Sequence, residues 1–187
     1  MSVICVFGDS IVWGAYDLEL GGWVNRLKLY LNNLGNFDTD VYNFGVSGDK
    51  VKDVLKRIDI EAKSIKPDKI IFAIGINDSP HLAHLFGTKL TDFENQFRQL
   101  LEKAKKFTEN IVIVGLINVA ENTKLHGYSN QKIEKYNQVV EKIAQEENLL
   151  FVGQFFSLSN EDFEDGLHPN SKAHQKIFEK VKEILEK

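Results

Sequence analysis

Short apolar runs alternate with longer helical patterns along the chain, and this alternation restricts the fold more than any other feature. Each apolar run is bounded by turn-forming residues, as buried strands of a parallel sheet are. The patterns between the runs repeat apolar residues every three or four positions, which is typical of amphipathic helices. Strands and helices that alternate in this way form a parallel sheet with helices on both faces. The sequence therefore predicts an α/β fold, a three-layer α/β/α sandwich.

The predicted sheet has five strands, and the flavodoxin-like order 2-1-3-4-5 is expected for it. The strands are expected at Val3–Phe7, Asp40–Phe44, Lys69–Ile74, Ile111–Leu116 and Leu149–Val152. The helices are expected at Trp23–Leu34, Lys50–Ile65, Thr91–Phe107, Ser129–Asn148 and from Asn170 onward. The third strand is nearly all apolar, so it is placed in the middle of the sheet.

Two helix starts carry a sequence signal of their own. Thr91 is followed three residues later by Glu94, which predicts a capping box at the start of the third expected helix. Pro169 is expected at the first position of the last helix, where its missing N–H costs nothing. Residues Ile11 to Gly22 are expected to form a loop punctuated by glycines.

Length and charge exclude several classes of protein. A chain of 187 residues is expected to form a single domain, 1–187, around one core. No stretch is long and apolar enough to span a membrane, and no signal peptide is recognisable, so no stable membrane anchor is expected. The net charge of −4 argues against a nucleic-acid partner. The oligomeric state is not readable from the sequence.

Cys5 is the single cysteine, so it cannot form a disulfide within the chain. It lies in the first predicted strand, and we interpret it as a core residue rather than a catalytic thiol. A lone thiol of this kind fits a reducing compartment, which favours a cytoplasmic protein.

Polar segments follow the predicted strands at the edge where parallel sheets bind their ligands. Gly8–Ser10 follows the first strand, Asn43–Gly45 the second and Gly75–Asp78 the third. Asp165–Pro169 comes after the fifth strand and just before the last helix. Because the carboxyl ends of parallel strands share one edge, we expect these four segments to lie together.

These segments hold the groups that acyl transfer needs. The Ser10 hydroxyl is a candidate nucleophile, but it needs an imidazole to accept its proton. His168 can supply that base, and Asp165, three residues earlier, can orient its ring. The backbone N–H groups of Ser10 and Gly45 and the side-chain amide of Asn77 are expected to form an oxyanion hole.

Together these residues resemble the SGNH hydrolases, also called the GDSL esterase/lipase family. The resemblance rests on four blocks in order: Gly8–Ser10 with Gly14, Asn43–Gly48, Gly75–Asp78 and Asp165–Pro169. It implies Ser10 as nucleophile, His168 as base and then acid, and Asp165 as its orienting carboxylate. It implies Ser10, Gly45 and Asn77 as oxyanion donors. Ile11 stands where the family name would have Leu, a change that touches no catalytic role.

The expected function is that of a serine esterase that acts through an acyl-enzyme on a small-molecule ester, with no metal and no organic cofactor. Short acyl groups such as acetyl, on a small or sugar-like alcohol, are favoured. Lysophospholipase, thioesterase and acyltransferase activities remain alternatives on the same site. A catalytically silent binding module is the alternative outside enzymes.

Other residues are interpreted more simply. Trp13 and Tyr16 are candidates for a wall of the substrate pocket, with a surface loop as the alternative. His81 is a third pocket candidate, within a segment (Pro80–Leu90) that could cover the site. His81 and His84 could also face one another as metal ligands, but the sequence offers no third ligand at a suitable spacing, so no metal site is expected. Asp9 and Asp78 are expected to accept local backbone hydrogen bonds rather than to act in catalysis. His126 and His174 carry no motif and are expected at the surface.

Overall fold

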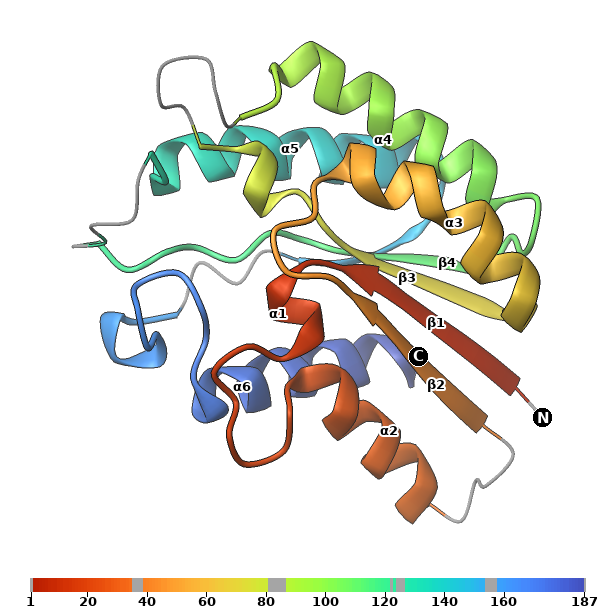
Figure 1. Cartoon of the computed structure of the whole chain (residues 1–187), viewed down its shortest axis with the longest axis horizontal. Coiled ribbons are helices and arrows are strands. Elements are labelled where there is room, and N and C mark those ends of the chain that lie inside the picture. The colour runs from red at the N-terminus through yellow and green to blue at the C-terminus, as the bar shows by residue number, and fades with distance from the viewer. Residues whose placement is uncertain are drawn as a thin grey trace.

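The protein forms a five-stranded parallel sheet in the order β2-β1-β3-β4-β5, as seen in the computed structural model (Figure 1). The structure describes residues 2–34, 39–80, 87–121, 123, 127–153 and 158–186. The strands are β1 (Ser2–Gly8), β2 (Thr39–Gly45), β3 (Lys69–Ala73), β4 (Ile111–Val114) and β5 (Leu150–Val152). The predicted strand order is confirmed, and β3 lies in the centre of the sheet as expected.

Helices cover both faces of this sheet, which confirms the predicted three layers (Figure 1). The six α-helices are α1 (Ser10–Trp13), α2 (Trp23–Asn33), α3 (Val51–Ile65), α4 (Leu90–Ala104), α5 (Asn130–Glu146) and α6 (Ser171–Leu185). Helices α3, α4 and α5 lie on one face, and α2 and α6 pack together on the other. There are also two short 3-10 helices: η1 (Ile76–Asp78) follows β3, and η2 (Asn160–Asp162) lies between β5 and α6. Among the described residues, no helix combines the length and hydrophobicity needed to cross a membrane.

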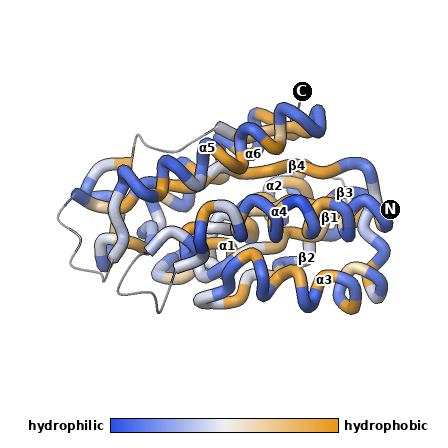
Figure 2. Tube along the Cα trace, turned by 90° about the horizontal axis from the view of Figure 1, so that it is seen from above, coloured by the Kyte–Doolittle hydropathy of each residue, from blue (hydrophilic) through white to orange (hydrophobic). Residues whose placement is uncertain are grey.

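The core follows from the hydrophobic pattern. Apolar residues make up most of β1, β3, β4 and β5, whereas β2 also carries the polar residues Asp40 and Asn43. Apolar and polar positions alternate along the helices (Figure 2). Four buried rings link the sheet to α4: Phe7 packs on Phe72 at 5.9 Å, Phe72 on Phe97 at 6.4 Å, and Phe97 on Phe93 at 5.9 Å between centroids. Cys5 is fully buried in β1, where burial raises the pKa of its thiol to about 12. Its interpretation as a core residue is confirmed.

Two local expectations at the N-terminal half of the chain are wrong. Residues 11–13 of the expected loop instead belong to the short helix α1 (Ser10–Trp13), which is capped by Asp9 and is too short to show a helical repeat in sequence. The capping box at Thr91 and Glu94 does not form. Helix α4 begins one residue earlier, at Leu90, and its N-cap is Lys89, which makes no side-chain cap bond.

The start of the last helix also differs from the prediction. Helix α6 begins at Ser171, and its cap is Asn170, whose side chain accepts the Ala173 N–H at 3.1 Å. Pro169 lies before the cap and forms an isolated antiparallel bridge with Phe163. His174 is not at the surface as predicted: it is 0% exposed and fully enclosed between α6 and the start of α2. His126 lies outside the described residues.

Two isoleucines of α3 give a matched test of the core. Ile58 is fully buried, whereas Ile60 is 73% exposed on the same helix. We expect Ile58→Ala to lower the free energy of unfolding by about 2–5 kcal/mol, because it removes buried contacts and leaves a cavity. Ile60→Ala should change it by less than about 0.5 kcal/mol. Urea unfolding followed by circular dichroism measures both, and equal losses would contradict the assigned face of α3.

Candidate active site

The nucleophile candidate lies at the sharp turn from β1 into α1. Asp9 caps α1, since its Oδ1 accepts the Ile11 N–H at 2.9 Å. Ser10 is the first residue of the helix, so its own N–H is among the donors that the helix leaves unpaired. Gly8 makes the turn possible, because an added Cβ would lie 2.2 Å from Val12 Cγ2 and 2.4 Å from the Ala73 carbonyl oxygen.

Ser10, His168 and Asp165 form a continuous chain of hydrogen bonds. The Ser10 Oγ lies 3.0 Å from His168 Nε2, and His168 Nδ1 lies 2.7 Å from Asp165 Oδ2. The other oxygen of Asp165 accepts the backbone N–H groups of Leu167 at 3.0 Å and His168 at 2.8 Å. These bonds fix the carboxylate so that it accepts the Nδ1 proton, which leaves Nε2 free to accept from Ser10.

The Asp165 carboxyl is held in its ionised form. Burial alone raises its pKa, but the hydrogen bonds from the backbone and ring of His168 and from the backbone of Leu167 outweigh burial. The net result is a pKa below the usual value for Asp. A negative charge is therefore present beside the imidazole throughout the neutral pH range.

The Asn77 amide is held from both of its ends. Its Nδ2 donates to the Asp49 carbonyl at 3.0 Å, and its Oδ1 accepts from the Tyr128 hydroxyl at 2.7 Å. This orientation fixes the amide and leaves its second N–H available to a ligand. Tyr128 was missed in the sequence, where it is a single tyrosine beside a polar loop and carries no motif.

Gly45 and Gly48 occupy different environments. The Gly45 N–H donates to Asn43 Oδ1 at 2.9 Å, and a Cβ added to Gly45 would lie 2.2 Å from the Trp13 nitrogen. Gly45 therefore packs behind α1, and its amide already has a partner. Gly48 instead lines the cavity beside Ser10 and Asn77, with φ at +83°. Within the described part of the chain, the Gly48 N–H makes no hydrogen bond. In the sequence, Gly48 could have been found as the second glycine of the block Asn43–Gly48.

An open cavity of about 710 Å³ lies over the serine and the imidazole. It is lined by Ser10, Trp13, Ala15, Tyr16, Leu18, Ser47, Gly48, Asn77, Tyr128, Leu167 and His168. Trp13 and Tyr16 are 60% and 51% exposed, and the Tyr16 ring lies 5.2 Å from the His168 ring. The pocket candidate His81 and most of the expected cover lie outside the described residues. The described residues contain no cluster of three or more His, Cys, Asp or Glu side chains able to hold a metal.

Asp9 and Asp78 are buried beneath this site. Asp9 accepts a local backbone hydrogen bond as expected, whereas the partners of the Asp78 side chain are distant in sequence. Asp9 accepts from Ile11, and Asp78 accepts the Val51 N–H at 3.1 Å and the Thr88 hydroxyl. Burial is the main cause that raises the pKa of Asp9 to about 7 and that of Asp78 to about 6. These two carboxyls differ from Asp165 because fewer donors offset their burial.

Comparisons with known proteins give the class and the family. The sequence profile of the GDSL-like lipase/acylhydrolase family matches residues 6–176. An acetylxylan esterase from Geobacillus stearothermophilus is 30% identical over 117 residues, which cover 60% of this chain and only 52% of that protein. The chain thus aligns with about half the length of this relative. The esterase TesA from Pseudomonas aeruginosa is 26% identical over 183 residues, which cover 95% of this chain and 85% of that protein.

Solved structures agree on the fold. A catalytic mutant of the acetylxylan esterase Axe2 from Geobacillus stearothermophilus superposes with a TM-score of 0.85 at 24% identity, over 98% of this chain and 94% of that one. The crystal structure of TesA gives 0.82 at 24% identity, over 98% of both chains. The fold is therefore that of the SGNH hydrolases, a class of carboxylic ester hydrolases. The chain belongs to the GDSL-like lipase/acylhydrolase family, as its motif blocks suggested.

The raised pKa of Asp9 predicts how stability depends on pH. The unfolded carboxyl ionises near pH 4, whereas the folded one keeps its proton up to about pH 7. The folded state therefore binds more protons in this interval, and the free energy of unfolding falls as pH rises from about 4 to about 7. Asp9→Asn keeps an oxygen for the Ile11 N–H and removes the buried ionisation.

We expect Asp9→Asn to exceed the wild type in stability by roughly 4 kcal/mol at pH 8, and to match it near pH 4. Urea unfolding at both pH values measures the difference. Asp40→Asn, in β2 and away from this edge, is the control and should show no such dependence. A gap between Asp9→Asn and the wild type that is equal at the two pH values would contradict the raised pKa.

Proposed function

We propose that this protein hydrolyses carboxylic esters through an acyl-enzyme on Ser10, with His168 and Asp165 as its partners. The observation that carries the proposal is the chain of hydrogen bonds from Ser10 to Asp165, at 3.0 and 2.7 Å, which opens onto the 710 Å³ cavity. A hydroxyl in this arrangement can lose its proton to the imidazole as it attacks a carbonyl. The membership of an esterase family supports the same reaction.

The reaction proceeds in two symmetrical halves. Ser10 Oγ attacks the ester carbonyl while His168 Nε2 takes its proton, and Asp165 stabilises the imidazolium that forms. His168 then protonates the departing alcohol oxygen as the carbon–oxygen bond of the ester breaks. Water attacks the acyl-enzyme with His168 again as base, and the carboxylic acid leaves as Ser10 recovers its proton.

We assign the oxyanion donors to Ser10 N–H, Gly48 N–H and Asn77 Nδ2. The first two amides have no partner in the described structure, and the third has one N–H to spare. Gly48 replaces Gly45 in this assignment, because the Gly45 amide already donates to Asn43. Such donors act most strongly when they are fixed before the reaction, and the bonds from Asn77 to Asp49 and Tyr128 provide that fixation.

The substrate proposal is a short acyl ester, such as an acetyl group, on a sugar-like alcohol. An acetylxylan esterase from Geobacillus stearothermophilus is found among both the sequence relatives and the solved structures, which supports this class. The exposed rings of Trp13 and Tyr16 flank the nucleophile and offer flat apolar surfaces on which a sugar ring can lie. We place this reaction in the cytoplasm, because a reducing compartment is where a free thiol such as that of Cys5 stays reduced.

A series of p-nitrophenyl esters from acetyl to palmitoyl tests the proposal. We expect the highest kcat/KM at acetyl or butyryl, and a loss of at least about 10³-fold in Ser10→Ala. Ser64→Ala, on the outer face of α3, serves as the control and should retain full activity. A peak at long chains would favour a lipase or lysophospholipase, and transfer to an added alcohol would favour an acyltransferase. Undiminished hydrolysis by Ser10→Ala would overturn the proposal.

Tyr128→Phe tests the fixation of Asn77. The variant keeps the ring but removes the hydrogen bond to Asn77 Oδ1. A neutral hydrogen bond contributes about 1 kcal/mol, so kcat should fall about 5- to 10-fold while KM stays within about twofold. Tyr30→Phe loses a comparable bond to Glu186 at the far end of α2 and should leave kcat unchanged. An unchanged kcat in Tyr128→Phe would show that the amide keeps its orientation without this hydroxyl.

A further inference from the structure

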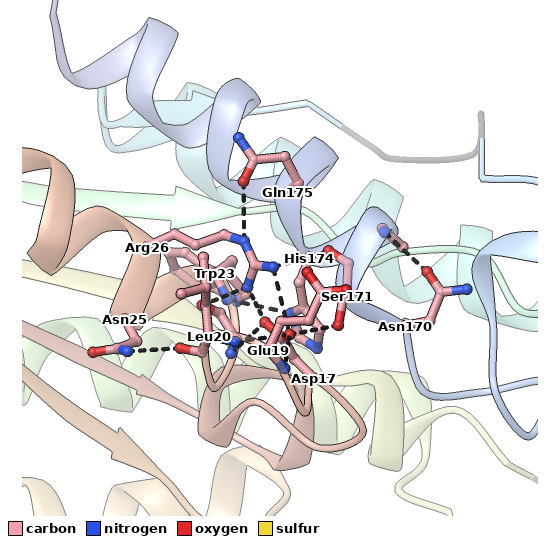
Figure 3. Close-up of polar contacts among 12 residues, drawn as sticks. Asp17, Glu19, Leu20, Trp23, Asn25, Arg26, Asn170, Ser171, His174 and Gln175 are labelled. Carbon is pink, nitrogen blue, oxygen red and sulfur yellow. Dashed lines mark hydrogen bonds and ion pairs between the residues drawn. The ribbon is translucent and has the colours of Figure 1, made fainter.

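A buried polar cluster joins the segment that follows Ser10 to the helix that follows His168 (Figure 3). We call Asp17, Arg26, Ser171 and His174 the Asp17 cluster. Its members come from the loop after α1, from α2 and from the first turn of α6. The side chains of Asp17 and Arg26 are 0% and 4% exposed, and His174 is fully buried. None of these residues lines the catalytic cavity.

The Asp17 carboxylate organises the loop around it. Its Oδ2 accepts the Gly22 N–H at 2.7 Å, and its Oδ1 accepts the N–H groups of Glu19 and Leu20, both at 3.2 Å. The same Oδ1 accepts the Ser171 hydroxyl of α6 at 2.7 Å. One carboxylate therefore closes the loop on itself and attaches it to α6.

Arg26 extends this attachment from α2. Its guanidinium pairs with Asp17 and donates to the Ser171 carbonyl at 3.2 Å. Its Nε donates to Gln175 Oε1 at 3.0 Å, one turn further along α6 (Figure 3). A guanidinium with several donors in a fixed plane is suited to holding three segments in one geometry.

His174 fastens the opposite side of the loop. Its Nδ1 accepts the Trp23 N–H at 3.3 Å, so Nε2 carries the proton and donates to the Ala15 carbonyl at 3.2 Å. Burial lowers the pKa of His174 to about 4, which keeps the ring neutral and this pattern constant at neutral pH. Ala15 and Trp23, at the two ends of the loop, are thus tied to the same side chain.

The cluster joins the two segments that flank the Ser10–His168 bond, the loop after Ser10 and the helix after His168. The loop that it closes supplies Ala15, Tyr16 and Leu18 to the cavity. Tyr16 has a left-handed backbone, with φ at +64°, and its ring lies 5.2 Å from that of His168. A non-glycine residue keeps such a conformation only where its surroundings impose it. On the other side, only Pro169 and Asn170 separate His168 from Ser171.

We propose that the Asp17 cluster is the positioning device of the active site, in which Asp17 sets the distance and angle between Ser10 and His168. This inference rests on the proposed function. A buried ion pair adds little net stability compared with apolar residues of the same size. It does impose a defined geometry, and catalytic groups need their alignment held within about half an ångström. Asp17 is therefore a positioning residue, and it acts through Tyr16 and α6.

Asp17→Asn is the central variant, because it keeps the size and the acceptor oxygen but removes the charge that pairs with Arg26. We expect kcat for p-nitrophenyl acetate to fall at least 10-fold while KM changes less than about twofold. Ser171→Ala removes one bond from a partly exposed position, so the variant should fold and lose about 2- to 5-fold in kcat. Leu101→Ala, in α4, lowers stability without touching the cluster and should keep the wild-type kcat.

Two further readouts separate positioning from general stability. A small fluorophosphonate should label Ser10 more slowly in Asp17→Asn and Ser171→Ala, in proportion to their kcat. The downfield NMR signal of the His168 Nδ1 proton should shift or broaden in these two variants and not in Leu101→Ala. Wild-type kcat, labelling and NMR signal in Ser171→Ala, together with lowered stability alone in Asp17→Asn, would overturn the inference.

The design also separates this inference from the proposed function. A wild-type protein that neither hydrolyses esters nor reacts with the fluorophosphonate would refute the esterase proposal. The His168 signal would still report whether Asp17 sets the geometry of the pair, because it requires no reaction. If Asp17→Asn fails to fold, Ser171→Ala decides the outcome with the same three measurements.

Discussion

The parallel pairing of β1 with both β2 and β3 is the constraint on which the rest of the structure depends. In this register Gly8 lies opposite Gly45 on one side and Ala73 on the other, so the three strands end at one level. The chain then turns into Ser10, into the segment up to Gly48, and into η1 with Asn77. Backbone hydrogen bonds between the strands therefore bring three distant segments to one edge of the sheet.

Three aspartates near this edge show how environment assigns different properties to one residue type. Asp9 and Asp78 lie deepest, and burial dominates and raises their pKa values. Asp165 is partly exposed and receives three hydrogen bonds from the turn it belongs to, which lowers its pKa. Asp9 and Asp78 therefore serve to cap a helix and to hold a loop, whereas Asp165 keeps a negative charge beside the imidazole. Depth and donor count decide the difference.

His168 is positioned differently from Ser10, which directly follows a strand of the sheet. Its turn is held by the bridge between Phe163 and Pro169 and by the bond from the Ala120 N–H to the Gly166 carbonyl, not by the sheet. A side chain presented in this way has no strand to fix its position. The Asp17 cluster lies where such support is needed, because it links α6, just after the histidine, to the loop just after the serine.

The sequence alone determined the layers, the strand order and the segments that meet at the site, because periodicity and turn residues are local properties of the chain. It also placed Ser10, Asp165, His168 and Asn77 in one cluster through their motif blocks. Only the tertiary structure distinguished Gly48 from Gly45, brought Tyr128 to Asn77 and buried His174 against Trp23, 151 residues away. Those contacts depend on how helices pack across the sheet, and no local pattern encodes which distant side chain will meet another.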